Sequence, residues 1–284
     1  MKHWQNFLMT ALVAWLSVVG CDMSPTSSQS PTSEPAAASR PIVPAKPSAA
    51  VQGPMFSFVE AKMVVLQLPL GSVSQSGDIW TYLSEEAVVT AGGNNLAANG
   101  IRVGLGKSSD WPEMAAILTA LSGRELSLGR VILRSDATTP VNLKQDQPIQ
   151  TIFLCNADGT LTGADYAPGD NIMMMTALVS MEDRKSVLLT GNLAIQVGQR
   201  PLRFQSAPAG YTLAAEQRFF TLPGMQFKLT VPPGGIIVIV PSSQSSRTSS
   251  VGNHFLIRQR EGISFETVLV LMPEAMTAPV NQGQ

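Results

Sequence analysis

Short apolar segments separated by turn residues dominate the chain from Arg124 onward, and this pattern limits the possible folds more than any other feature. Such segments alternate apolar and polar residues, or run wholly apolar, over the length of a strand. They are residues 126–133, 149–155, 172–180, 187–197, 218–222, 226–231, 236–240, 254–260 and 264–272. Because no helix pattern separates these strands, an antiparallel arrangement is favoured over a parallel, doubly wound sheet.

The part of the chain before Arg124 mixes strands with short helices. Residues 56–70 and 101–105 have the pattern of strands, and Asp78 is expected to cap a short helix. A second helix is expected after Asp110, which would cap it, because apolar residues recur there at helical spacing up to Leu121. The sequence therefore predicts a mainly β (α+β) fold, an antiparallel sandwich or barrel-like domain with a short helical segment near its N-terminal part.

Composition separates one folded unit from flanking segments. Residues 24–50 hold 7 Ser, 6 Pro, 6 Ala and 2 Thr among 27 positions, which leaves too little apolar surface to fold. If extended at about 3.1 Å per residue, this stretch would reach roughly 80 Å. We expect a signal peptide at residues 1–20, a disordered linker at 21–54, a folded β-rich domain at 55–276 and a disordered tail at 277–284.

The first 21 residues have the layout of a bacterial export signal. A short basic start is followed by an apolar run over residues 7–19 and by the small residue Gly20 before Cys21. Residues 16–21, Leu-Ser-Val-Val-Gly-Cys, resemble the lipobox of bacterial lipoproteins. The resemblance implies cleavage after Gly20 and a lipid on the thiol of Cys21, which would anchor the protein in a membrane of the cell envelope, with its domain in the periplasm or at the cell surface. Asp22 resembles the inner-membrane retention signal of enteric-type lipoproteins, and the choice of membrane stays open.

Charge and cysteine content argue against several classes of function. The chain has 19 basic and 20 acidic residues and a formal charge of −1, which gives no electrostatic case for binding nucleic acid. If Cys21 carries lipid, Cys155 is the remaining thiol, and His254 is the one histidine beyond the signal. We therefore expect a buried structural Cys155, no internal disulfide, no zinc or copper site and no cofactor.

Two further motifs admit a structural interpretation. Residues 104–108, Gly-Leu-Gly-Lys-Ser, lack the glycine spacing of a phosphate-binding loop, and we interpret them as a turn that leads into the helix after Asp110. The run 173–175 of three methionines is interpreted as sheet core, because adjacent strand residues point to opposite faces.

Carboxylates and amides leave more than one interpretation open. Calcium prefers oxygen ligands of this kind, although Asp and Asn are also expected at hairpin turns without an ion; the candidates are Asn156, Asp158, Asp165, Asp170 and Asn171. Glycoside hydrolysis requires only a pair of carboxylates, for which the candidates are Glu85 with Glu86 and Glu261 with Glu266. Solvated carboxylates are the commoner case, and the sequence favours a protein that is not an enzyme.

The segment 242–250 is a candidate contact surface. It contains six serines and Arg247 in nine residues and joins two apolar strands, and Arg258 and Arg260 lie just beyond it. The segment is either a loop that contacts a partner or a solvated connection. Because charged residues make up 14% of the chain, part of the β surface is open to coverage by another envelope protein.

A proline- and glycine-containing hairpin followed by an apolar last strand marks the C-terminal third. Residues 229–240 and 265–274, with Gly252 between them, resemble the end of a bacterial secretin core. This resemblance implies an accessory component of a secretion or pilus-type envelope assembly. The sequence favours a lipid-anchored envelope protein with a non-catalytic structural or binding role. The accessory component is the first alternative, and a carboxylate-dependent hydrolase is the second.

Overall fold

The computed structural model describes residues 55–91, 95–121, 124–135, 137–197, 202–207, 210–215 and 218–279. The predicted signal peptide and linker, with Gly20 and Cys21, lie outside these residues. Within them the protein is mainly β with antiparallel sheets, as the sequence predicts. No helix in the described ranges is long and apolar enough to cross a membrane.

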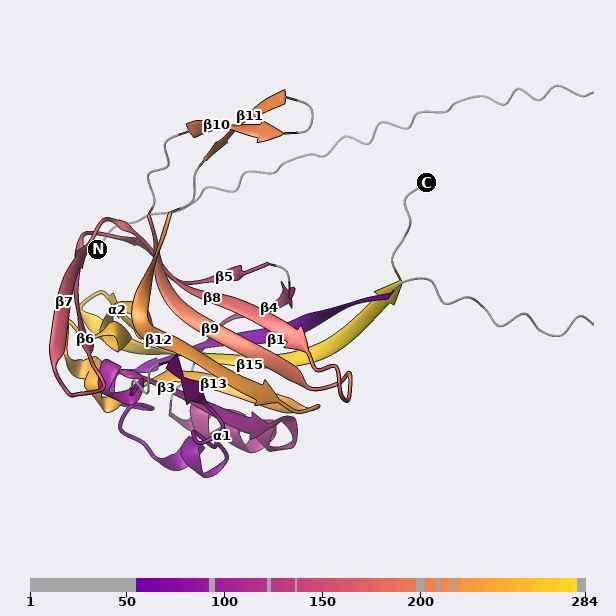
Figure 1. Cartoon of the computed structure of the whole chain (residues 1–284). Coiled ribbons are helices and arrows are strands. Elements are labelled where there is room, and N and C mark those ends of the chain that lie inside the picture. Colours follow the sequence, from indigo (N-terminus) through magenta and orange to yellow (C-terminus); the bar gives the residue numbers. More distant parts are fainter. Residues whose placement is uncertain are drawn as a thin grey trace, which may run out of the picture. The chain divides into compact units, whose positions relative to one another are not determined.

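The first sheet joins the two ends of the folded unit. Its strands run in the order β3 (Ile101–Lys107), β13 (Gly235–Pro241), β15 (Ile263–Pro279), β1 (Met55–Pro69) and β4 (Arg124–Leu133), and β14 (Ile257–Arg260) also pairs with β15. β1 and β15 pair along their whole described register, from Met55 opposite Pro279 to Pro69 opposite Phe265. Figure 1 shows these two strands side by side. β15 thus runs past the expected domain boundary at Met276.

The second sheet packs against the first. Its order is β2 (Val89–Thr90), β12 (Phe219–Val231), β9 (Val187–Val197), β8 (Gly169–Val179) and β5 (Thr139–Gln147). Two separate hairpins pair β6 (Gln150–Cys155) with β7 (Leu161–Tyr166) and β10 (Leu202–Ala207) with β11 (Gly210–Ala215). Neither large sheet closes on itself in the described part of the chain, so the arrangement is a sandwich.

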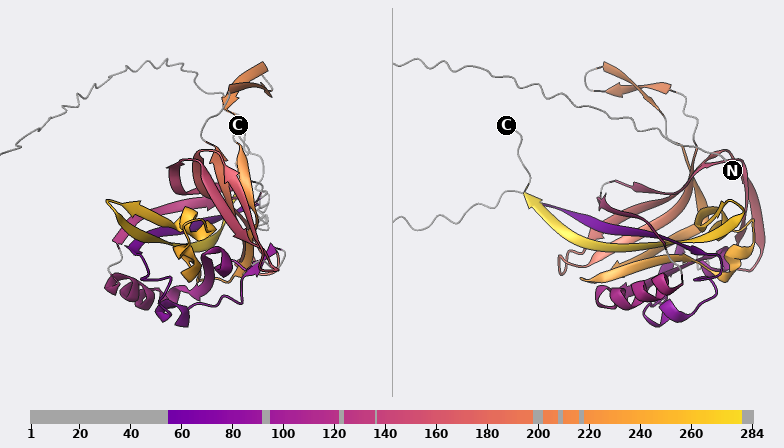
Figure 2. Two further views of the ribbon diagram at one scale, coloured as in Figure 1. Left: turned by 90° about the vertical axis from the view of Figure 1, so that its left-hand side faces the viewer. Right: turned by 180° about the vertical axis from the view of Figure 1, so that it is seen from behind.

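The centre of the first sheet, at β13 and β15, is buried on both faces. On one face its side chains meet the second sheet in an inner core that includes Ile237 and Leu269 of the first sheet and Met173 and Leu189 of the second. On the other face, Val238 and Val270 pack in an outer core against short helical segments. These are α1 (Trp111–Ala120) and η1 (Asp78–Thr81), and η4 (Ser108–Asp110) leads into α1. Figures 1 and 2 show the helical segments and the second sheet on opposite sides of the first sheet.

Two-sided burial explains the composition of β13. All seven of its residues are buried, because alternate side chains enter alternate cores. Each aliphatic side chain that is fully removed from water contributes about 1.5–3 kcal/mol. This strand therefore reads as an unbroken apolar run rather than as an alternating one.

The Gly-Leu-Gly motif of residues 104–106 lets η1 approach the sheet closely. A Cβ at Gly104 would lie 2.9 Å from atoms of Leu83 and Trp80, and one at Gly106 would lie 2.9 Å from Leu83. β3 continues through both glycines to Lys107, and η4 and α1 follow. The motif is thus part of a strand that packs tightly against a helical segment.

Several local predictions are wrong. Asp110 precedes α1, but its side chain accepts a hydrogen bond from Ser109 Oγ at 2.9 Å and caps no backbone N–H of the helix. Asp78 was expected to cap η1, but it is the first residue inside this helix, and the N-cap position is occupied by Gly77. The predicted strand 254–260 is divided between helix α2 (Val251–Leu256) and β14. The two predicted strands 218–222 and 226–231 form the single strand β12, with an irregularity between Thr221 and Gln226.

A buried carboxylate fastens the loop after β1 to the last strand. Glu266 on β15 is fully buried. Its carboxylate accepts hydrogen bonds from the backbone N–H groups of Gly71, Val73 and Ser74 at 2.8, 2.7 and 3.2 Å, and from the hydroxyl of Ser74. Hydrogen bonds to an ionised acceptor are about twice as strong as neutral ones. Glu266 therefore replaces the hydration of its charge with donors from a single loop.

We predict that Glu266→Gln lowers the free energy of unfolding by roughly 2–4 kcal/mol, because an amide offers one acceptor oxygen and turns its own N–H₂ toward the loop donors. Urea unfolding measures the loss. Glu274→Gln, an exposed glutamate on the same strand, is the matched control and should stay within about 0.5 kcal/mol of wild type. Equal effects of the two substitutions would contradict a structural role for Glu266.

Candidate functional site

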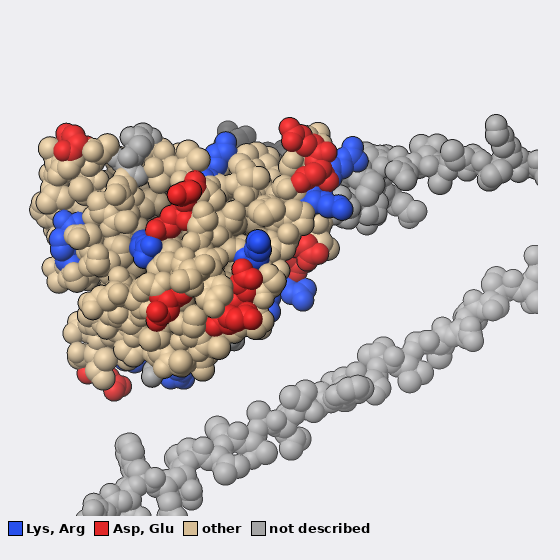
Figure 3. Space-filling model, turned by 90° about the horizontal axis from the view of Figure 1, so that it is seen from below, with Lys and Arg blue, Asp and Glu red and all other residues tan. Residues whose placement is uncertain are grey.

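Charged side chains are sparse on the surface. Figure 3 shows acidic and basic residues interspersed on one face, most of which is uncharged. The three arginines that the sequence singled out lie in two different hollows. Arg247 lines one hollow, whereas Arg258 and Arg260 line another.

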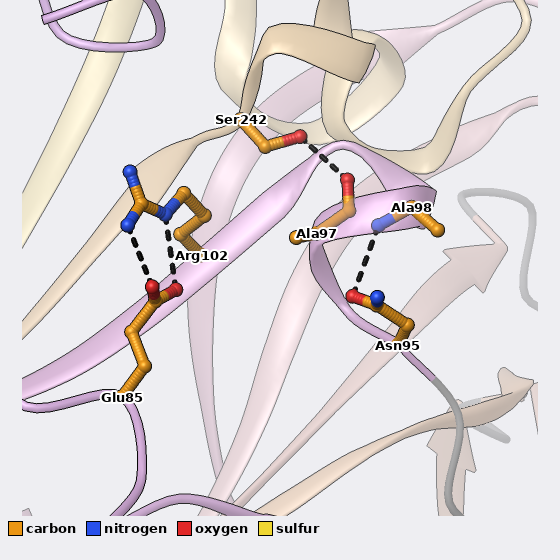
Figure 4. A network of polar contacts seen from close by, with 6 residues as sticks. All are labelled: Glu85, Asn95, Ala97, Ala98, Arg102 and Ser242. Atoms are coloured by element: carbon orange, nitrogen blue, oxygen red, sulfur yellow. Dashed lines mark hydrogen bonds and ion pairs between the residues drawn. The ribbon is translucent and has the colours of Figure 1, made fainter.

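The segment 242–250 is fastened to a turn of the chain. It contains η5 (Ser243–Ser246) and lies against η3 (Ala97–Asn99). Ser242 Oγ donates to the carbonyl of Ala97 at 2.6 Å, shown in Figure 4, and Arg247 Nη2 donates to the carbonyl of Ala98 at 2.9 Å. Ser250 Oγ accepts from Asn253 N–H at 3.2 Å and so caps α2. Much of the polarity of this segment is therefore used in holding local structure.

Arg247 lines a hollow of about 460 Å³, which is also lined by Arg102. The charge of Arg102 is neutralised by an ion pair. Arg102 forms a bidentate ion pair with Glu85, at 3.0 and 2.6 Å, as Figure 4 shows. Its guanidinium also lies 3.4 Å above the ring of Trp80. Glu85, one of the proposed acid–base carboxylates, is thus committed to Arg102, and Glu86 is exposed beside it.

The second hollow, of about 390 Å³, gathers cations and amides from both sheets. We call it the cationic hollow. The lining residues come from β1, β5 and β14 and are Gln67, Lys144, Gln145, Gln147, Arg258, Gln259 and Arg260. Its lining contains three cations, four amides and no carboxylate.

The cations of the cationic hollow repel one another. Burial, together with the charge of Arg258, lowers the pKa of Lys144 to about 8. Burial lowers the pKa of Arg258 as well, and the charge of Arg260 adds to this effect. His254, close by, has its pKa lowered by burial and by Lys144, and its Nε2 lies 3.1 Å from the carbonyl of Thr151. These shifts mark a place where positive charge is concentrated at a cost.

Arg258 holds the two sheets together at this hollow but is only partly satisfied. Its Nη2 donates to the carbonyl of Leu143 on β5, which lies 115 residues away in the sequence. Its Nε is buried without a hydrogen-bond partner. No carboxylate in the described ranges forms an ion pair with Lys144, Arg258 or Arg260.

The other candidate residues lie apart from the cationic hollow or are engaged in local contacts. Cys155, which was expected to be buried, is half-buried at the end of β6 and lines the hollow of Arg247. Its N–H donates to Asn99 Oδ1 at 2.7 Å, and Asn99 Nδ2 donates to its carbonyl at 2.8 Å. His254 contacts the start of β6 rather than Cys155. Glu261 is exposed in the turn after β14, and Glu266 is enclosed by its loop donors.

The candidate calcium ligands make separate local hydrogen bonds. Asp158 accepts from Thr160, Asp165 from Thr151, and Asp170 from the N–H of Asp146. Asn156 donates to Thr160 and Thr162, and buried Asn171 exchanges hydrogen bonds with Gln150. Among the residues that the structure describes, no three His, Cys, Asp or Glu side chains come close enough to hold a metal ion.

The methionine run is sheet core, as predicted. Met173 and Met175 are fully buried in the inner core, while Met174 points to the other face of β8 and is half-buried. The alternation follows from the two-residue period of a strand.

Comparisons with known proteins add little. No protein-family model and no curated protein matches the chain. Among solved structures, a chain of the "Klebsiella pneumoniae type II secretion system outer membrane complex. PulD, PulS and PulC HR domain" is similar at 6% identity and a TM-score of 0.19. The match covers 80% of this chain and 40% of that chain, so this chain spans less than half of that neighbour's length. At this TM-score the likeness gives no information on fold or function.

Sequence reasoning missed Lys144, one of the three cations of the cationic hollow. Lys144 lies on β5, where Val141 and Leu143 are the two buried apolar residues of residues 139–147. This weak alternation is the one feature of the sequence that indicates a strand there. No local pattern connects Lys144 to Arg258, because the two meet only when β5 and β14 are brought together by different sheets.

We predict a pH-dependent gain in stability that depends on Lys144. Its pKa is about 8 in the folded protein against the ordinary 10.5, so between these values the unfolded chain binds a proton that the folded chain does not. The free energy of unfolding should therefore rise as pH increases from about 8 to 10.5, by roughly 1–2 kcal/mol after allowance for solvent screening.

Urea unfolding across this pH range, compared with Lys144→Gln, isolates the effect. The variant should lose this part of the rise, whereas Lys228→Gln, which removes an exposed lysine on β12, should retain it. Identical pH profiles for wild type and Lys144→Gln would show that Lys144 has no lowered pKa.

Proposed function

We propose that this chain is a lipid-anchored protein of the bacterial cell envelope whose β-sandwich is a non-catalytic binding module. The observation that carries the binding role is the cationic hollow, where Lys144, Arg258 and Arg260 face a common space without an ion-pair partner. These side chains stand on strands of a doubly packed sandwich, and sites on such strands are held more firmly than sites on loops.

The sequence before the folded unit supports the anchor. The lipobox-like residues 16–21 place Cys21 behind a short apolar run, and the Ser-, Pro- and Ala-rich linker follows. β1 begins at Met55, where the linker was expected to end. A linker of this length would allow the folded domain, with its hollow, to lie away from the bilayer surface.

The environments of the proposed acid–base carboxylates support a role other than hydrolysis. Glu85 is paired with Arg102, and Glu266 has its oxygens occupied by four donors. A general acid or base must reach a proton of its substrate, and these two groups are already engaged.

A second candidate, an accessory component of an envelope assembly, is favoured by the free edge of β4. In the described part of the chain β4 pairs with β1 and with no strand on its other side. Leu128 and Ile132 on this strand are 58% and 59% exposed. An exposed apolar edge strand is a template for pairing with another chain.

We predict that Cys21→Ala abolishes lipid attachment and releases the protein from the membrane fraction. Metabolic labelling with radioactive palmitate, followed by fractionation, measures both. Cys155→Ala removes the other cysteine and should leave labelling and fractionation unchanged. Persistence of Cys21→Ala in the membrane fraction, in its unlabelled form, would refute lipid anchoring as the means of attachment.

Purification from gently solubilised envelopes separates the two candidate functions. If the β4 edge holds a partner, the tagged wild type should bring down a stoichiometric protein that is lost in Ile132→Lys and kept in Met181→Lys, a control at a residue 89% exposed on the β8–β9 turn. A protein purified without a partner would rule out the assembly role and leave the binding module.

A further inference from the structure

The cationic hollow concentrates positive charge that nothing in the described chain neutralises. Lys144 comes from β5, and Arg258 and Arg260 come from β14, so two sheets contribute cations to one space. Within the described ranges, Arg102 pairs with Glu85 and Arg130 pairs with Glu60, so carboxylates do serve as partners of other arginines. The hollow therefore brings three cations without an ion-pair partner together in a nearly neutral protein.

Arg258 does not lose its proton to reduce the repulsion between the cations. A guanidinium stays charged under all ordinary conditions, and only Lys144 can relieve the repulsion by titration. Arg258 also keeps a buried Nε without an acceptor, beyond the bond that it gives to Leu143. A role in joining β14 to β5 accounts for one of its donors and leaves the unpartnered Nε unexplained.

Thr267 is a second unsatisfied polar group near this end of the sandwich. It lies on β15 opposite Gln67, which lines the hollow, and its hydroxyl is buried without a hydrogen-bond partner. Phe265, two residues before Thr267, is opposite Arg258. This end of the first sheet therefore carries two unmatched polar groups, the Nε of Arg258 and the hydroxyl of Thr267. Buried polar groups without partners are uncommon in native proteins.

The amides define the rest of the chemistry. Gln67, Gln145, Gln147 and Gln259 each offer a carbonyl acceptor and an N–H₂ donor, which suit hydroxyl groups that both donate and accept. Arginine matches a carboxylate or phosphate through paired hydrogen bonds. A volume of about 390 Å³ lies in the range of pockets for small ligands, roughly 300–1,000 Å³.

We propose that the cationic hollow binds an acidic sugar, a saccharide unit that carries a carboxylate or a phosphate. The anion lies between Lys144, Arg258 and Arg260, and the sugar hydroxyls contact the glutamine amides. This inference rests on the proposed binding role and specifies its ligand class. A free sugar acid, a sugar phosphate and the acidic unit of an envelope glycan share this chemistry.

Isothermal titration calorimetry of the detergent-solubilised full chain tests the proposal with four probes. Glucuronate supplies a carboxylate, glucose 6-phosphate supplies a phosphate, glucose supplies hydroxyls alone, and inorganic phosphate supplies an anion alone. We expect glucuronate, glucose 6-phosphate or both to bind at least tenfold more tightly than glucose and than inorganic phosphate. The one that binds identifies the acidic group.

Two variants locate the binding in the hollow. Arg260→Gln and Lys144→Gln should each weaken the binding of the acidic sugar about tenfold or more, and the exposed-lysine variant Lys228→Gln should leave it unchanged. Neither Arg260 nor Lys144 makes the inter-sheet bond of Arg258, and thermal unfolding of each variant confirms that it is folded.

Three results would overturn the proposal. The first is no binding of either acidic sugar at concentrations up to about 10 mM. The second is that inorganic phosphate binds as tightly as the acidic sugar, which would indicate a nonspecific anion site. The third is that the acidic sugar still binds with unchanged affinity to both Arg260→Gln and Lys144→Gln. The proposed anchor fails separately, through palmitate labelling of Cys21. The binding role survives a wrong ligand class if a different small ligand binds the wild type and is lost in Arg260→Gln and Lys144→Gln, whereas a partner lost in Ile132→Lys supports the assembly role instead.

Discussion

Burial of the centre of the first sheet on both faces is the constraint on which the rest of the structure depends. β13 and β15 send alternate side chains into the inner and outer cores, so the second sheet and the helical layer are each required to remove one face from water. The pairing of β1 with β15 joins the two ends of the folded unit within this sheet. Glu266 then fixes the chain as it leaves β1, through four hydrogen bonds at the end of the same strand pair.

The candidate site follows from where this packing ends. β14 continues the first sheet beside the start of β15, after α2, and its arginines meet β5 at the edge of the second sheet. There the apolar interior gives way to glutamines and cations, of which Lys144 and Arg258 are half-buried and Arg260 is exposed. Arg258 bridges the sheets through Leu143, while Lys144 and Arg260 remain without a countercharge in the described chain. The junction of β5 and β14 is therefore both a structural contact and a cluster of positive charges without a carboxylate partner in the described chain.

The sequence predicted the fold class and most central strands, because β8, β9, β13 and β15 carry strong apolar patterns. It missed β5 and β7, since an edge strand with two interior apolar residues and an almost wholly exposed hairpin strand give little local signal. It identified Arg258 and Arg260 as polar residues worth attention but grouped them with Arg247, which the fold places in another hollow. Lys144 could not be added, because its proximity to Arg258 depends on sheet packing across more than 100 residues.

Hydrogen–deuterium exchange of the detergent-solubilised full chain, with and without a saturating acidic sugar, tests most directly the claim that the junction of β5 and β14 is a binding site. We expect slower exchange confined to peptides that cover Leu143 to Gln147 and Ile257 to Arg260, with neighbouring β1 affected near Gln67. Slower exchange over residues 242–250 around Arg247, with no change at β5 and β14, would contradict it and assign binding to the other hollow.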